Sequence, residues 1–236
     1  MARDNVVDKD FALVASRKHT AILCAILVAI AVAGYLATLQ ARGGAQSGSS
    51  PGGIALYLPL LIAEWGLFLY VRSGLKRAGT KVASVVATRP LTGGTLLADL
   101  ALGALLFAAM LGVEWLLDQT ICSGNQAGVK PLLARHAGDI PLWILLSLSA
   151  GFVEEFAFRG YLQRQFGALL RCPWCGVVAQ ALLFGVTHGY QGPLLVVRIT
   201  VIGLVFGAAA KARRSIVPGV VAHAAMDILG GLAAFR

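Results

Sequence analysis

Long apolar runs recur along the chain, and they constrain its fold more than any other feature. Of the 236 residues, 58% are hydrophobic and 13% are charged, whereas a soluble domain is roughly 45–50% apolar and about 25% charged. A bilayer span needs about 20 mainly apolar residues in succession, and several runs approach that length. The sequence therefore predicts an all-α fold, a polytopic transmembrane helix bundle.

We expect about seven spans. The fourth is predicted to continue as a helix toward residue 170. The fifth is short, which predicts a tilted, broken or partly inserted segment. Polar segments separate the runs: a leader at 1–18, a Gly/Ser-rich loop at 40–53, a basic connector at 72–89 and a polar loop at 118–139. The predicted spans are residues 20–39, 54–71, 96–117, 140–162, 176–189, 194–210 and 216–235.

The basic residues predict an orientation for the bundle. With seven spans, 14 of the 20 Lys and Arg residues fall on one side of the membrane and four on the other. Cytoplasmic segments carry this excess, so we expect a multi-pass protein of the cell membrane with its N-terminus in the cytoplasm and its C-terminus outside. The net charge of +9 then reports orientation and contact with anionic lipid. No aromatic-basic motif is visible, so nucleic acid is not an expected partner.

Two adjacent carboxylates and a guanidinium lie inside the fourth span. Charge at that depth costs a few kcal/mol per residue or more and usually serves function. Glu155 and Arg159 are four residues apart, so they share a helix face and are expected to neutralise each other. Glu154 faces Phe158 at the same spacing and has no such partner. This contrast predicts Glu154 as the chemically active group and Glu155–Arg159 as the pair that holds the geometry. The alternatives are a helix-packing ion network and a helix end that emerges into water.

Two histidines are expected to approach this pair from later spans. At 1.5 Å per residue, Glu154 and His223 lie about 13 and 10 Å from the cytoplasmic ends of their spans, and they are therefore nearly level. His188 falls near the outer end of a straight fifth span and does not fit that depth. His19 and His136 lie in polar segments and receive no predicted role.

Three motifs occur in order in the late spans: Glu154-Glu155-x-x-x-Arg159, Phe184-x-x-x-His188 and His223-x-x-x-Asp227. Together they resemble the CPBP family, which includes type II CAAX prenyl endopeptidases and bacteriocin-immunity-like membrane proteins. The resemblance covers about residues 140–235. It implies an all-helical intramembrane bundle and a glutamate-dependent endopeptidase without an obligatory metal. It also divides the chain into residues 1–139, a leader with three spans of unassigned role, and residues 140–236, the catalytic membrane core.

The resemblance also implies roles for six residues. Glu154 and His188 would activate a water molecule, and His223 with Asp227 would stabilise the oxyanion. Glu155 and Arg159 would support the first motif. Position 227 is often Asn in the prenyl endopeptidases, and an ionised Asp accepts hydrogen bonds only. Asp227 is thus expected to be protonated or to orient His223.

Several other functions remain open at this point. No cofactor is expected, although Glu154, His188, His223 and Asp227 would also suit a zinc protease. Cys172 and Cys175 have redox-like spacing, but one such pair favours a structural role. The expected substrate is a membrane-anchored or lipidated protein or peptide. The alternatives are a sorting protease for C-terminal tails, a non-catalytic immunity or scaffold protein, and a proton-coupled transporter that uses Glu64 and Arg198.

Overall fold

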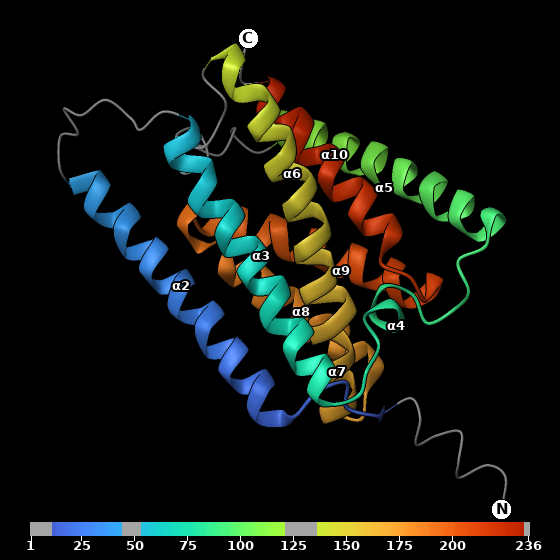
Figure 1. Cartoon of the computed structure of the whole chain (residues 1–236). Helices are drawn as coiled ribbons and strands as arrows, with labels where there is room; N and C mark the ends of the chain where they lie inside the picture. The colour runs from blue at the N-terminus through green and yellow to red at the C-terminus, as the bar shows by residue number, and fades with distance from the viewer. Residues whose placement is uncertain (1–10, 44–52, 121–135, 234–236) are drawn as a thin grey trace, which may run out of the picture.

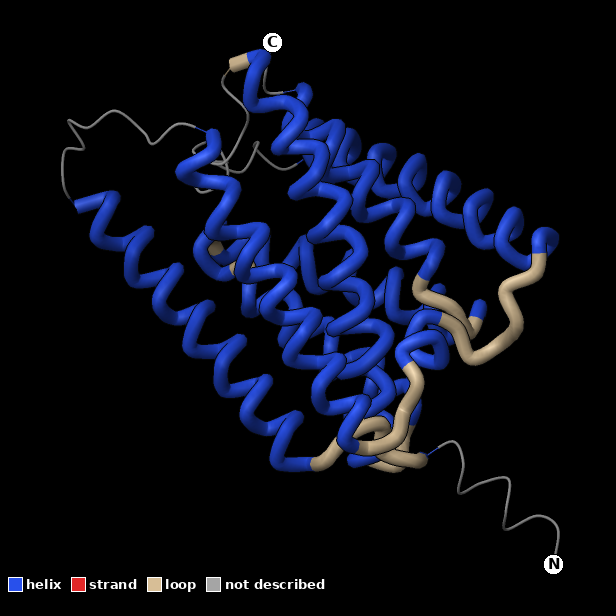
Figure 2. The backbone as a smooth tube through the Cα atoms, viewed as in Figure 1, coloured by secondary structure: helices blue, strands red, loops and turns tan. Residues whose placement is uncertain are grey.

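The computed structural model describes residues 11–43, 53–120 and 136–233 as a bundle of helices joined by short loops (Figures 1 and 2). The α-helices are α2 (Arg17–Gly43), α3 (Gly53–Arg77), α4 (Val82–Val86), α5 (Gly93–Thr120), α6 (Ile140–Glu155), α7 (Gln163–Leu169), α8 (Pro173–Thr187), α9 (Pro193–Arg213) and α10 (Val217–Ala233). A π-helix, η5 (Phe156–Leu162), joins α6 to α7, and two 3-10 turns are η4 (Ala137–Asp139) and η6 (Gly189–Gln191).

The predicted helical membrane bundle is confirmed. Five helical segments are long and apolar enough to cross a bilayer, and α8 and α10 are shorter apolar helices. The fourth segment runs through α6, η5 and α7 to residue 169, as predicted. The helix α2 begins and α10 ends at opposite ends of the bundle (Figure 1). The membrane orientation and the division near residue 140 remain predictions.

Some predicted boundaries are wrong. The connector at 72–89 is not all loop, because α3 continues to Arg77 and α4 forms within the connector. The fifth helix starts at Pro173, which can occupy the first helical turn because its missing N–H has no intrahelical partner there. Cys172 caps that helix, and its sulfur accepts a hydrogen bond from the Cys175 N–H. These cysteines also form a disulfide.

Parts of the leader and of both polar loops, namely residues 1–10, 44–52 and 121–135, lie outside the described residues.

The central helix α6 packs against α3 on one side and α10 on the other. Small residues allow the close approach of α10. A Cβ on Gly151 would lie 2.8 Å from the Ala224 backbone nitrogen and Cβ, which is closer than such atoms normally approach. Membrane helices associate through close packing of this kind, because lipid offers no hydrophobic driving force between them. Gly151 therefore sets the spacing that brings α10 to the end of α6.

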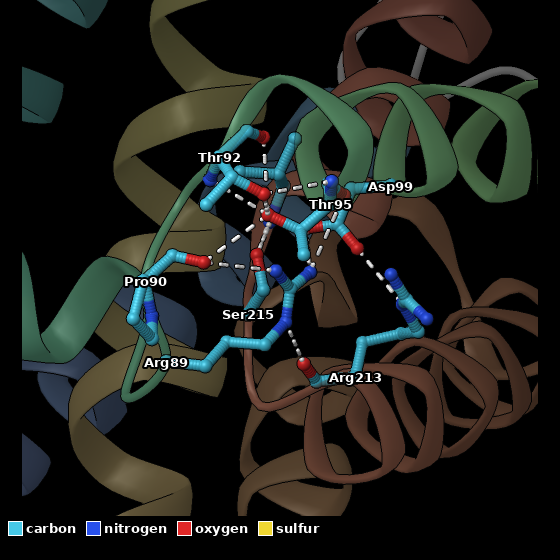
Figure 3. Close-up of polar contacts among 8 residues, drawn as sticks. Arg89, Pro90, Thr92, Thr95, Asp99, Arg213 and Ser215 are labelled. Carbon is cyan, nitrogen blue, oxygen red and sulfur yellow. Dashed lines mark hydrogen bonds and ion pairs between the residues drawn. The ribbon is translucent and has the colours of Figure 1, made fainter.

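A buried carboxylate fastens α5 to the end of α9 (Figure 3). Asp99 is fully buried; its Oδ2 lies 2.6 Å from an Arg89 guanidinium nitrogen and its Oδ1 lies 2.8 Å from Nε of Arg213. Arg89 also donates a hydrogen bond of 2.7 Å to the Arg213 carbonyl. Since α5 packs on α10, this ion cluster holds the outer helix that supports α10.

Replacing Gly151 with Ala should lower the stability of the bundle. Inserting a methyl group into a tight contact typically costs about 1–3 kcal/mol. The matched control is Gly66→Ala in α3, because a Cβ there meets no atom within 4 Å. Thermal unfolding in detergent would measure both variants. Equal melting temperatures for the two would contradict the proposed close contact.

Asp99→Asn should destabilise the attachment of α5, because it leaves two guanidinium groups without their shared carboxylate. Removing one partner of a buried pair costs about 3–5 kcal/mol, and we expect the lower end since Arg89 and Arg213 are partly exposed. Glu114→Gln is the control, as it neutralises an exposed position of the same helix. An Asp99→Asn protein as heat-stable as this control would show that the cluster contributes little.

Candidate functional site

The site begins where α6 gives way to a π-helix. Glu154 and Glu155 end α6, and Arg159 lies within the π-helical turn that follows. Single π-helical turns occur frequently at functional sites. Arg159 lies 2.9 Å from Glu155 Oε1, and neither side chain is exposed. The predicted ion pair at this spacing is therefore present, and it is fully buried.

His223 of α10 meets three carboxyl groups. Its Nδ1–H donates a hydrogen bond to Glu155 Oε1 at 3.2 Å. Its Nε2 lies 3.7 Å from Glu154 Oε2 and 3.6 Å from Asp227 Oδ2. The structure thus brings together five of the six predicted residues, and the expectation that Glu154 and His223 lie level agrees with their separation.

The two adjacent glutamates occupy different environments. The Glu155 side chain is fully buried and lies between Arg159 and His223, whereas 16% of the Glu154 side chain is exposed. Asp227 is the most open member of the group, with 37% of its side chain exposed. Glu154 is therefore the glutamate that a reactant can approach.

Two glycines make room for this arrangement. Gly151 lies one turn before Glu155 and admits α10, as described above. Gly219 of α10 lies directly against the Glu155 carboxylate, at a distance that leaves no space for a Cβ. The resulting contact presses α10 onto the ion pair and places His223 one turn further along the helix.

The Phe184 ring connects His188 to the other polar side chains of the site. The Phe184 ring centroid lies 4.8 Å from that of His188 and 6.0 Å from that of His223. The Arg159 guanidinium carbon lies 4.1 Å from the same centroid, a cation–π contact. The Phe184 ring therefore adjoins all three polar side chains, with Arg159 over its face and the two histidines edge-on.

The sixth predicted residue, His188, is less tightly joined to the others. It lies just after α8, and its Nδ1–H donates to the Phe184 carbonyl at 2.8 Å. That bond fixes the tautomer and leaves Nε2 as an acceptor. Within the described residues, no hydrogen bond or ion pair links His188 directly to Glu154. Its ring faces Tyr190 of η6 at 6.2 Å, and Tyr190 in turn lies within electrostatic range of Glu154 and Asp227.

One site residue was not predicted. Glu64 of α3 lies within electrostatic range of Glu154, His223 and Asp227, and its Oε2 is buried without a hydrogen-bond partner among the described residues. Its only sequence signal was an acidic residue inside an apolar run, which the sequence analysis associated with the transporter alternative. Nothing in the spacing of its own helix relates it to residues about 90 positions later.

The described residues do not present a ready metal site. No group of three or more His, Cys, Asp and Glu side chains within them is arranged to hold a metal ion. The zinc alternative, which would use Glu154, His188, His223 and Asp227, remains a prediction from the sequence. The reaction considered below is derived from side chains alone.

A pocket of about 580 Å³ reaches the ion pair from another direction. Its lining includes four cationic residues: Arg159, Arg164, Lys211 and Arg214. Glu154 and His223 do not line it. This pocket is therefore distinct from the place where the exposed edge of Glu154 meets His223.

Comparison with known proteins gives one match, to a family model. Residues 136–229 match the family model described as type II CAAX prenyl endopeptidase Rce1-like, and this segment contains all six predicted residues. No curated protein and no solved structure matches the chain. The segment starts close to the predicted limit of the resemblance and leaves α2, α3 and α5 outside it. Residues 136–229 of this multi-pass membrane protein are therefore similar to the Rce1-like type II CAAX prenyl endopeptidases.

Proposed function

We propose that this chain is an integral-membrane endopeptidase that hydrolyses a peptide bond of a membrane-associated protein or peptide with water activated by Glu154. The family match over residues 136–229 supports a CAAX-type membrane endopeptidase in general terms. The observation that carries the proposal is the contrast between two neighbours. Glu155 is buried and paired with Arg159, while Glu154 is partly exposed and adjoins His223.

Amide hydrolysis requires a base for water, donors for the oxyanion and a proton for the leaving amine. In the proposed reaction, Glu154 accepts a proton from water as the water oxygen bonds to the carbonyl carbon. His188 helps to orient this water through Nε2, since Nδ1–H is committed to the Phe184 carbonyl. When the carbon–nitrogen bond breaks, Glu154 returns the proton to the leaving amine.

His223 is the proposed donor to the oxyanion. Its Nδ1–H is held by Glu155, so its orientation follows from the buried ion pair. Its Nε2 faces the more exposed side of the site, near Glu154 and Asp227. A protonated imidazole at this position donates from Nε2, which is the property that a developing oxyanion needs.

The expected substrate is a protein or peptide that the membrane itself presents. A site built on helices that cross the bilayer favours a segment held at the membrane by a lipid or an apolar anchor.

Replacing Glu154 with Gln should abolish cleavage while the protein stays folded. General-base catalysis typically contributes about 10²–10⁴-fold in rate, and Gln keeps the shape of the side chain. Termini of membrane proteins would be compared by proteomics in cells carrying wild type, Glu154→Gln or the control Glu114→Gln at matched expression. We expect protein termini that appear with wild type and with the control but not with Glu154→Gln.

Full cleavage by the purified Glu154→Gln protein would overturn the general-base role. Identical sets of termini from folded wild type and folded mutant would instead favour an immunity protein or a transporter. Uptake of solute into vesicles driven by a pH gradient would then identify the transporter.

Arg159→Ala should reduce both stability and activity. It strands the buried Glu155 carboxylate, and breaking a buried pair in this way costs about 3–5 kcal/mol. Arg159→Lys should recover part of the stability, because it restores the charge without the planar fork of the guanidinium. Thermal unfolding and peptide cleavage would be measured on the same preparations. A fully stable but inactive Arg159→Ala protein would favour direct contact with substrate instead.

A further inference from the structure

The pocket of about 580 Å³ beside the ion pair has a wall made from two segments that lie far apart in the sequence. Residues 85–88 lie at the end of α4, and residues 214–216 connect α9 to α10. An isolated antiparallel bridge between Ala87 and Ser215 joins the two segments, with further backbone hydrogen bonds on both sides of it. This wall of the pocket is therefore a fixed part of the fold.

Three cations around this pocket, Arg164, Lys211 and Arg214, have no carboxylate partner among the described residues. Arg164 donates a hydrogen bond of 2.8 Å to a backbone carbonyl, and Arg214 donates from Nε to Thr88 Oγ1 at 3.3 Å. Lys211 Nζ lies 5.4 Å from the centroid of the Trp174 ring. Guanidinium and ammonium groups each carry several N–H donors, so most of these donors remain available to a ligand.

Two buried carboxylates near the pocket are already paired. The fourth cation of its lining, Arg159, lies 2.9 Å from Glu155 Oε1. Asp99 is shared by two arginines, one of which is Arg213, the residue before Arg214 (Figure 3). No aspartate or glutamate of the described segments lines the pocket itself. Like charges gathered around one pocket repel one another, and a bound anion would be attracted to all of them.

The pocket lies at the end of a helix that can cross the bilayer. The apolar helix α9 is long enough to do so, and Lys211 lies in its last turn. Lysine and arginine side chains at such helix ends reach the level of the lipid headgroups. Basic pockets between membrane helices bind phospholipid headgroups on the cytoplasmic side, which is the side predicted for these basic residues. Apolar side chains such as Val85 and Ile216 complete the lining, so the setting suits an anionic group on a partly apolar ligand.

We propose that this pocket binds a phosphate group, held by Arg164, Lys211 and Arg214 and carried by an anionic phospholipid or by a soluble phosphate compound. A phosphate has more oxygen acceptors than a carboxylate, so it can accept hydrogen bonds from several cations at once. The planar fork of arginine matches phosphate oxygens in pairs, and lysine adds a point charge. Glu154 and His223 do not line the pocket, so this inference is independent of the proposed function.

A general excess of positive charge at this end of the bundle is the simplest alternative. Membrane proteins carry such an excess for orientation alone, and the same number of charges removed from any nearby position should then weaken binding equally. The pocket pair, Lys211→Gln with Arg214→Gln, removes two charges from the lining. The control pair, Lys76→Gln with Arg171→Gln, removes two charges from exposed positions outside it. Arg171 matches Arg214 closely, because both have a left-handed backbone, with φ of 51° and 54°.

Purified full-length protein in a zwitterionic detergent would be tested with two probes. The first is phosphatidylglycerol, with diacylglycerol, which lacks the phosphate, as its control. The second is inorganic phosphate, with sodium chloride at equal ionic strength as its control. Native mass spectrometry would count bound lipid. Thermal unfolding would measure stabilisation, because a ligand that binds only the folded state raises the melting temperature.

We expect phosphatidylglycerol to bind and stabilise wild type and the control pair. In the pocket pair its Kd should rise about tenfold or more, since each lost charge-assisted hydrogen bond costs about that factor. The same pattern with inorganic phosphate alone would identify a soluble phosphate compound as the ligand. Equal weakening in both pairs, equal binding of diacylglycerol, or no binding of either phosphate probe to wild type would overturn the proposal. Should the pocket pair fail to fold, Arg214→Gln and Arg171→Gln alone provide the same comparison, because both side chains are exposed.

Discussion

The contact between Arg159 and Glu155 determines the rest of the site. Both side chains are fully buried, and the same Glu155 oxygen that faces Arg159 also accepts the His223 hydrogen bond. A buried pair of this kind is costly to desolvate and contributes little net stability, but it is strongly destabilising to break. The role of the ion pair here is to fix the positions of the neighbouring side chains. It fixes an anion at the end of α6, and that anion fixes the imidazole against which Glu154 is placed.

Close packing converts this local contact into a relation between helices. Gly151 and Gly219 remove the side chains that would hold α10 away from Glu155. On the opposite side, Phe184 lies against Arg159 and presents its ring to both histidines. The three family motifs therefore correspond to three faces of one cluster, although they come from α6 with η5, from α8 and from α10. The aromatic residue of the second motif links His188 to the ion pair without a direct polar contact.

Sequence patterns predicted those parts of the structure that depend on one helix at a time. Apolar runs located the helices, and the spacing of four residues identified the Glu155–Arg159 pair. Depth within the spans placed Glu154 level with His223, which requires only the helical rise and two boundaries. Glu64 was not predicted as a site residue because its relation to Glu154 depends on how α3 packs on α6. That packing arises from dispersed contacts such as Phe68 with Phe156, which have no periodic signature. The π-helix at Phe156–Leu162 was not predicted either, because nothing in its mainly apolar sequence distinguishes it from a continuation of α6.

The environment of His223 bears on the aspartate that replaces the more common asparagine at position 227. An asparagine side chain can donate a hydrogen bond to an oxyanion, whereas an ionised aspartate cannot. Asp227 lies 3.6 Å from His223 Nε2, and Glu154 and Glu155 also lie within 3.7 Å of the ring. These contacts give Asp227 a role that needs no donor of its own, which is to orient the His223 ring. In the proposed reaction, Asp227 therefore acts through His223 and does not itself donate to the oxyanion.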